Sequence, residues 1–288
     1  MQAVGSIGRR GFVTTAGALA VVAAWSVGFA VGDALAAPFL NAATIAGASR
    51  AGEDFHGSWR IPAGKAIEVK GINGDVRAER TAGSSVVVDA IKSARRSDPA
   101  SVEIEVIEHD GGITLCAHYP EPRGSRPNEC RPGRGGHMSN DNNDVTVDWV
   151  VRVPEGVRFV GRTVNGGVEA ESLDGPVEAY TVNGSVSLST DGYAIAETVN
   201  GSIHADIGAS RWPEPLEFKT VNGTITLVLP EDAGAELHAK TMNGEIVSDF
   251  PVMARGRIGK HRLSGTIGRG GSDLDLQTLN GTIHLTAR

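Results

Sequence analysis

Aromatic residues are scarce in this chain: Phe, Trp and Tyr together make up 5% of its 288 residues. A thick core built on aromatic side chains is therefore excluded. The 38 glycines instead indicate many turns, short strands and thin packing layers. The length suits one large all-β domain or two small ones.

An excess of basic charge is also lacking, since the formal net charge is −7 at pH 7. A nucleic-acid partner requires a basic face that releases counterions from the phosphates. We therefore expect no binding to DNA or RNA.

The longest uncharged run lies near the N-terminus, at residues 11–32, directly after Arg9 and Arg10. It is followed by the small-residue sequence Ala34-Leu35-Ala36. A basic segment, an apolar segment and such a cleavage site, in this order, are typical of a signal peptide. The arginine pair also resembles a twin-arginine export signal. About 20 apolar residues can span a bilayer, so an uncleaved anchor is the alternative.

We therefore assign residues 1–37 to a signal peptide or membrane anchor and residues 38–60 to a linker. The sequence predicts an exported protein, located in the periplasm, at the cell surface or outside the cell. It would touch a membrane only through residues 11–32, and only if that segment is not cleaved.

The two cysteines, Cys116 and Cys130, flank a loop rich in Pro, Arg and Gly. In an oxidising compartment such a pair is most simply a disulfide. A zinc site that joins both thiolates to His118 and His137 is the alternative, although the spacing fits no standard zinc module. We predict the disulfide, and no metal or cofactor.

A Thr-Val-Asn-Gly turn recurs through the second half of the chain, and Ile72-Asn73-Gly74 is an outlying copy. The successive Asn residues from 165 onward are separated by 18, 17, 22, 21 and 37 residues. We interpret the last gap as hiding a worn copy at Leu263–Ile267. The predicted turn residues are Asn73, Gly74, Asn165, Gly166, Asn183, Gly184, Asn200, Gly201, Asn222, Gly223, Asn243, Gly244, Asn280 and Gly281.

Apolar and polar residues alternate after each Asn-Gly pair, as in a half-buried strand. A second turn, such as Leu173-Asp174-Gly175, follows, so each repeat contains two short strands and two corners. The positions expected to face inward are Val76, Ala78, Val168, Ala170, Val186, Leu188, Ile203, Ala205, Ile225, Leu227, Ile246, Ser248, Ile283 and Leu285.

Two architectures can carry this pattern. Asn-Gly is a strong signal for a type I′ hairpin, which would give an antiparallel meander. We favour an all-β, single-chain parallel β-solenoid of short two-strand rungs over residues 161–288, with the right-handed crossover of a β-helix. All Asn-Gly pairs share one phase of the repeat, so stacking would place Asn on Asn and allow an amide ladder.

Residues 61–160 are predicted to form an N-terminal β cap, because an open solenoid end exposes an unpaired edge. Their long alternating strands are expected at residues 85–91, 101–107 and 145–153. Insertions lengthen two corners of the solenoid, at residues 209–215 and 230–234. The first insertion contains Trp212 and is a candidate partner surface, together with the acidic, Ser- and Thr-rich outer strand faces.

The repeated Thr-Val-Asn-Gly turns, the V-R-V-P-E-G-V segment of residues 151–157 and the cysteine-bounded loop resemble the bacterial putative-adhesin family of β-repeat envelope proteins, a domain of unknown function. The resemblance covers about residues 60–288. It implies surface attachment and supplies no catalytic residues.

Catalytic chemistry has one candidate, the carboxylate pair Glu169 and Glu171. Glycoside hydrolysis needs two carboxylates roughly 5 to 10 Å apart, but solvated outer-face residues are the simpler interpretation. Residues 140–144 form either a hydrated polar loop or a weak match to a calcium loop. His204 and His284 are interpreted as surface histidines on distant rungs.

We therefore expect a non-enzymatic envelope module that binds an envelope protein or a glycan. The alternatives are a carbohydrate-active enzyme on a β-helix scaffold and a membrane-tethered partner in envelope stress or regulation.

Overall fold

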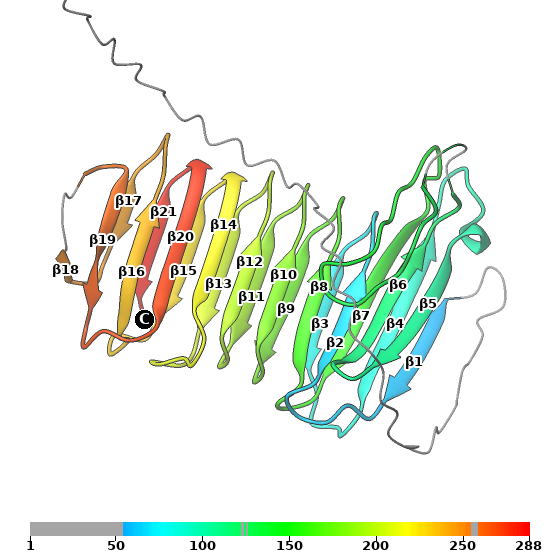
Figure 1. The fold of residues 1–288 in the computed structure, drawn as a ribbon, viewed down its shortest axis with the longest axis horizontal. Coiled ribbons are helices and arrows are strands. Elements are labelled where there is room, and N and C mark those ends of the chain that lie inside the picture. Colours follow the sequence, from blue (N-terminus) through cyan, green and yellow to red (C-terminus); the bar gives the residue numbers. More distant parts are fainter. Residues whose placement is uncertain (1–53, 122–123, 125, 255–258) are drawn as a thin grey trace, which may run out of the picture. The chain divides into compact units, whose positions relative to one another are not determined.

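Alternating apolar and polar residues form strands that assemble into two sheets (Figure 1). The computed structural model describes residues 54–288, except residues 122–123, 125 and 255–258. In spatial order, the 10-stranded sheet contains β1 (Phe55–Trp59), β4 (Val86–Ser93), β7 (Thr146–Val153), β3 (Val76–Arg80), β9 (Val168–Leu173), β11 (Val186–Thr190), β13 (Ile203–Ile207), β15 (Ile225–Leu229), β21 (Ile283–Ala287) and β17 (Ile246–Ser248).

The second sheet has 11 strands. In spatial order these are β18 (Val252–Ala254), β19 (Arg262–Ile267), β16 (Ala235–Lys240), β20 (Asp273–Asn280), β14 (Leu216–Asn222), β12 (Ala194–Glu197), β10 (Val177–Tyr180), β8 (Arg158–Arg162), β2 (Ala66–Lys70), β6 (Gly112–His118) and β5 (Glu103–His109). One 3-10 turn, Pro99–Ser101, is the only helical segment among the described residues. The predicted all-β class is confirmed.

From β8 to β18 the chain alternates between the sheets, and it does so again from β20 to β21. We call one strand of the 11-stranded sheet, the Asn-Gly turn after it and the next strand of the 10-stranded sheet a rung. Neighbouring rungs pair in parallel: Val186 of β11, for example, lies between Val168 of β9 and Ile203 of β13. The antiparallel meander is therefore excluded, while the handedness of the crossover stays a prediction.

The rungs do not stack wholly in chain order. The last rung, β20 and β21, lies between β14–β15 and β16–β17, which Figure 1 shows as red strands between yellow and orange ones. The interpretation of Leu263–Ile267 as a worn repeat is wrong. This segment belongs to β19, which runs antiparallel to both β16 and β18. It lacks the Asn that would join the stack, and it covers the edge of β16 as a returning strand.

The N-terminal part of the described chain joins the same two sheets. β2, the Ile72-Asn73-Gly74 turn and β3 form a rung that pairs in parallel with β8 and β9. Beyond this rung lie the antiparallel pairs β1–β4, β4–β7 and β5–β6. The division expected near residue 160 therefore coincides with no break in either sheet. The end of the predicted linker forms β1.

The core lies between the inner faces of the two sheets. Of the 14 positions predicted to face inward, all are buried except Ile246 and Ser248, which are half-buried because β17 is the last strand of its sheet. The three predicted long strands appear as β4, β5 and β7. The predicted signal peptide or anchor and most of the predicted linker lie outside the described residues. Within the described residues, no helix is long and apolar enough to cross a membrane.

Candidate interaction surfaces

Three of the four residues of the repeated turn hold neighbouring rungs together. The hydroxyl of Thr198 donates to the carbonyl of Gly184 on the adjacent rung over 2.8 Å. The amide Nδ2 of Asn200 donates to Oδ1 of Asn183 over 2.9 Å. The same bonds recur at the other turns and give one continuous amide ladder, in the order Asn73, Asn165, Asn183, Asn200, Asn222, Asn280 and Asn243.

The turn glycines are required by close approach between rungs. A Cβ on Gly201 would lie 1.9 Å from the carbonyl oxygen of Gly184 and 2.5 Å from its carbonyl carbon. Of the seven turn glycines, only Gly74 has a positive φ, and none of the turn asparagines does. The Asn-Gly pairs are therefore not type I′ turns, and at the six turns other than Gly74 the absent side chain, not an unusual φ, explains the glycine.

The second position of the turn makes no such contribution, and its side chain points to solvent. We call the side chains at this position the apolar row: Val164, Val182, Val199, Val221, Leu279 and Met242, in stacking order. Val221 is half-buried, and the exposed fractions of the other five run from 36% to 55%. Only the backbone of these residues takes part in stacking, as where Asn183 N donates to Val164 O over 2.7 Å. The side chains are therefore available for contact with a partner.

The carboxylates of Glu169 and Glu171 both lie on the outer face of the 10-stranded sheet, beside one guanidinium. Arg77 is 3.3 Å from Glu169 and 2.8 Å from Glu171. The hydrogen bond to Glu171, followed by the charges of both carboxylates, raises the pKa of Arg77. The pair therefore belongs to an exposed ion-pair cluster, and a glycosidase would need one of these carboxylates to act as an acid.

His204 and His284 lie closer together than the sequence predicted. Both pair in register with Thr226, so a single strand separates them. The prediction of distant rungs was wrong because β20 and β21 insert beside β14 and β15. Across the described residues, no group of three or more His, Cys, Asp or Glu side chains is placed to hold a metal ion.

The disulfide Cys116–Cys130 forms as predicted, with its Cα atoms 5.9 Å apart. His118 Nδ1 lies 3.4 Å from the Glu105 carboxylate. The zinc alternative is therefore not supported by the positions of these groups, because the two sulfur atoms bond to each other.

The segment directly after the disulfide, residues 131–135, is fastened to the outer face of the 11-stranded sheet by two buried charged residues of β2. Glu68 accepts from Gly133 N (2.8 Å), Thr114 Oγ1 (3.0 Å) and Arg162 Nε (2.8 Å). Lys70 donates to carbonyl groups of this segment, including that of Gly135 over 3.2 Å. Burial lowers the pKa of Lys70, and the charge of Glu68 opposes this effect.

Loss of the disulfide is expected to loosen this attachment. The double variant Cys116→Ser/Cys130→Ser should lose about 3 kcal/mol of unfolding free energy, because the unfolded chain regains the entropy of an open loop. Urea titration with and without reductant measures the difference. An unchanged midpoint would mean that the contacts of Glu68 and Lys70 with residues 131–135 hold this region without the covalent bond.

Two side chains of the polar loop at residues 140–144, Asn143 and Asp144, accept hydrogen bonds from backbone N–H groups. The Asp144 carboxylate accepts from Ser97 N over 2.8 Å and from Arg96 N over 3.3 Å. These bonds, foremost the one from Ser97, lower the pKa of Asp144. Asn143 Oδ1 accepts from Val145 N over 2.9 Å. This arrangement is typical of a polar turn.

Trp212 is not a surface residue. Its side chain is 5% exposed and belongs to the core cluster. The ring itself is therefore not available to a partner, while the insertion at residues 209–215 stays a candidate partner surface. The ring anchors the loop that follows β13.

Comparison with known proteins shows the family. The family model described as Toastrack DUF4097 matches residues 63–286. Since the match spans most of the sequence, the chain belongs to this family, a domain of unknown function, and the predicted resemblance is confirmed. No curated protein matches the sequence.

Solved structures with similar chain traces include a "putative cell adhesion protein" from Clostridium sporogenes, at 12% identity and a TM-score of 0.47. The similarity covers 82% of this chain and 100% of that one. A "putative adhesin" from Bacteroides fragilis has 12% identity and a TM-score of 0.36, over 81% of this chain and 96% of that one. These values are too low to carry an argument about function.

Proposed function

We propose that this protein is an exported, non-enzymatic interaction module of the cell envelope, and that it binds a protein partner through the apolar row. The observation that supports this proposal is that the four positions of the repeated turn have different structural roles. Thr, Asn and Gly hold the rungs together, whereas the residue between Thr and Asn is apolar in every copy and exposed in most. Contiguous exposed apolar side chains are typical of interaction sites.

The spacing of the row defines the kind of partner. Rungs repeat at the inter-strand distance of a sheet, about 4.8 Å, so the row presents evenly spaced aliphatic side chains beside the asparagine ladder. It contains no aromatic side chain on which a sugar ring could stack. A protein with a flat, apolar face is therefore the favoured occupant, and the row would form the apolar centre of the interface.

Export is supported by the disulfide, because disulfides persist in oxidising compartments outside the cytosol. Export is also supported by the sequence of residues 9–32, in which two arginines precede an apolar segment, as in a signal peptide. Right-handed crossover between the rungs remains part of the proposal. Mass spectrometry of the native N-terminus would distinguish a released protein from one tethered by residues 11–32.

A carbohydrate-active enzyme is the second candidate, on the strength of the Glu169 and Glu171 pair. The Arg77 contacts weigh against it, since both carboxylates are held by the same cation. Hydrolysis of a glycan that disappears in Glu169→Gln or Glu171→Gln, at unchanged stability, would favour this candidate over the interaction module.

The proposed function is tested by retention of envelope material on the immobilised chain from residue 38 onward. The probes are detergent-solubilised envelope proteins and purified peptidoglycan. The triple variant Val164→Thr/Val182→Thr/Val199→Thr keeps the β-branched shape and adds a polar group at each position. We expect it to retain at least fivefold less of the protein probe, because the apolar contact is lost.

A matched control carries three substitutions of exposed apolar residues outside the row: Ile91→Thr, Val247→Thr and Met253→Thr. It should retain as much protein as the unchanged chain. Equal losses in the two triple variants would show nonspecific adhesion and contradict the proposal. Retention of peptidoglycan alone, unaffected by the row variant, would contradict it as well.

A further inference from the structure

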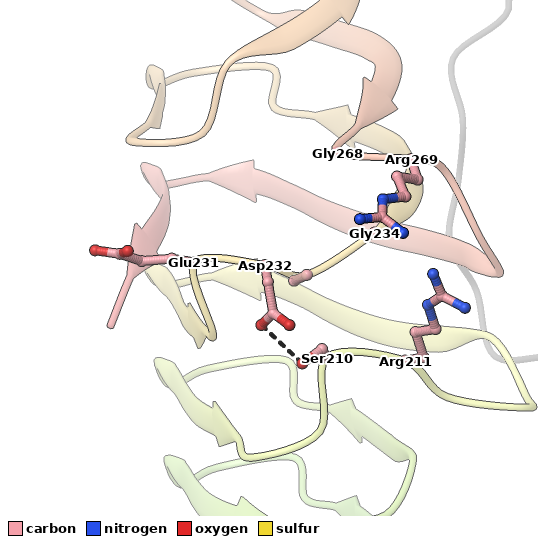
Figure 2. A pocket seen from close by; sticks show the side chains of 8 residues that line it. Ser210, Arg211, Glu231, Asp232, Gly234, Gly268 and Arg269 are labelled. Carbon is pink, nitrogen blue, oxygen red and sulfur yellow. Dashed lines mark hydrogen bonds between the residues drawn. The ribbon is translucent and has the colours of Figure 1, made fainter.

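Three corner loops meet at a cleft on the chain. They are residues 208–215 after β13, residues 230–234 after β15 and residues 268–272 after β19. The cleft has a volume of about 580 Å³, and its lining includes Arg211, Arg269 and Asp232 (Figure 2). Two of these loops contain the insertions that lengthen the rungs. The two insertions therefore do more than lengthen the rungs, because together with the third loop they build a concave site.

The cleft is held in shape by bonds between the loops. Ser210 Oγ donates to the Asp232 carboxylate over 2.8 Å, and Gly234 N donates to Ser210 O over 3.3 Å. Ser272 Oγ donates to Trp212 O over 2.8 Å, while the Trp212 ring is buried in the core. A site whose shape is fixed in advance loses less entropy when a ligand binds.

Backbone packing fixes the position of Arg269. A Cβ on Gly268 would lie 2.6 Å from Ala233 O, so the loop after β19 touches the loop after β15 without an intervening side chain. Gly268 and Gly270 have φ values of 55° and 75°. This tight turn carries Arg269 at its exposed tip, facing the cleft (Figure 2).

The two arginines that line the cleft differ from most arginines of the sheets in their ion pairing. Arg211 and Arg269 have no ion pair with any residue that the structure describes, whereas Arg77, Arg152 and Arg162 each lie beside carboxylates. Of the two lining carboxylates, Glu231 points away from both guanidinium groups (Figure 2), and Asp232 accepts from the Ser210 hydroxyl through Oδ1. Two guanidinium groups are thus left to bind an oxyanion, which arginine does through paired N–H donors.

We propose that this cleft binds an acidic saccharide, with Arg211 and Arg269 holding its carboxylate or phosphate and Asp232 accepting its hydroxyl groups. The volume lies in the range of small-molecule sites. The combination of free guanidinium groups with a carboxylate acceptor fits a ligand that is anionic at one point and a hydroxyl donor elsewhere. This site goes beyond the protein contact proposed for the apolar row and uses none of its residues, so either proposal can fail without the other.

Isothermal titration of the chain from residue 38 onward tests the proposal with four probes: trigalacturonate, glucose 6-phosphate, neutral maltotriose and inorganic phosphate. We expect one or both anionic sugars to bind with a Kd of about 1 mM or below and maltotriose to give no heat. Arg211→Gln/Arg269→Gln should weaken that binding at least tenfold. The control Arg60→Gln/Arg95→Gln makes the same change of charge at two exposed arginines outside the cleft and should leave binding unchanged.

The two sugars distinguish a carboxylate site from a phosphate site, and either result supports the proposal. Equal weakening by the control pair would show binding to overall charge and overturn it. Binding of inorganic phosphate as tight as that of the anionic sugars would overturn the saccharide assignment. Absence of binding by both acidic sugars, or equal binding of maltotriose, would overturn the site.

Discussion

Replacing Gly201 with alanine is expected to lower the free energy of unfolding by about 4 kcal/mol or more, beyond the usual cost of overpacking. The added Cβ would lie 1.9 Å from Gly184 O, and the nearest atoms belong to the backbone of the adjacent rung. The rungs cannot both keep their hydrogen bonds and make room for a methyl group. Urea unfolding followed by circular dichroism measures the loss.

The control is Gly83→Ala, where the nearest atom, Thr81 Oγ1, is 3.4 Å from the added Cβ. That contact is ordinary, and no positive φ is required there. We expect a change within about 0.5 kcal/mol, as for most surface substitutions. If Gly201→Ala were as harmless as Gly83→Ala, close stacking at the Asn-Gly turns would not be what determines the glycine.

Replacing Glu68 with alanine is expected to cost about 3 to 5 kcal/mol, because it leaves buried partners of the carboxylate unpaired. The side chains of Glu68 and Lys70 are both 6% exposed, and the two charges are 3.8 Å apart. Arg162 and the backbone of Gly133 lose their acceptor at the same time. We expect faster proteolysis at residues 131–135 as well, since Glu68 attaches Gly133 to the sheet.

Glu171→Ala serves as the control, because it removes a carboxylate of similar connectivity that is 49% exposed. Exposed ion pairs contribute about 0 to 1 kcal/mol. A double-mutant cycle between Glu68→Ala and Lys70→Met then isolates their coupling. A loss at Glu68 no larger than that at Glu171 would contradict a structural role for the buried network.

Local sequence patterns predicted the inward faces of the strands, the stacking of the rungs and the disulfide. The period-two alternation gave the inward positions, such as Val186 and Leu188, because a strand places successive side chains on opposite faces. The Asn-Gly pairs all fall at the same position of the repeat. This predicted parallel stacking, because stacked rungs place Asn on Asn. The two cysteines, together with the predicted export signal, predicted the disulfide.

Long-range order was not readable from the sequence. The stretch between Asn243 and Asn280 contains alternating residues whether it forms a rung or a returning strand, so nothing local showed that β19 pairs backwards with β16. The insertion of β20 beside β14 brought His204 and His284 within two strands of each other. The linker prediction missed β1, although Phe55, Gly57 and Trp59 alternate with polar residues there.

The charged cleft was missed because its residues come from three loops far apart in the chain. Arg211 and Arg269 are separated by 58 positions in the sequence, and each alone resembles any surface arginine. The burial of the Trp212 ring was not foreseen either: a polar insertion rich in proline is typical of a surface loop, yet its one large apolar residue is buried. The residue type itself indicated burial, since a large apolar side chain in a polar loop often anchors the loop to the core.

The most direct test of the account compares two neighbouring positions of the same turns. One variant carries Val164→Thr/Val182→Thr/Val199→Thr, and the other carries Asn165→Ala/Asn183→Ala/Asn200→Ala. Thermal unfolding and binding of the captured envelope protein are measured for both. If the apolar row is the contact surface, we expect the valine variant to lose binding while its melting temperature stays unchanged. We expect the asparagine variant to melt several degrees lower, because the hydrogen bonds of the amide ladder are lost, while it still binds in its folded state. Unchanged binding by the valine variant, at a partner concentration near the Kd, would contradict the central claim that the apolar row is the contact surface.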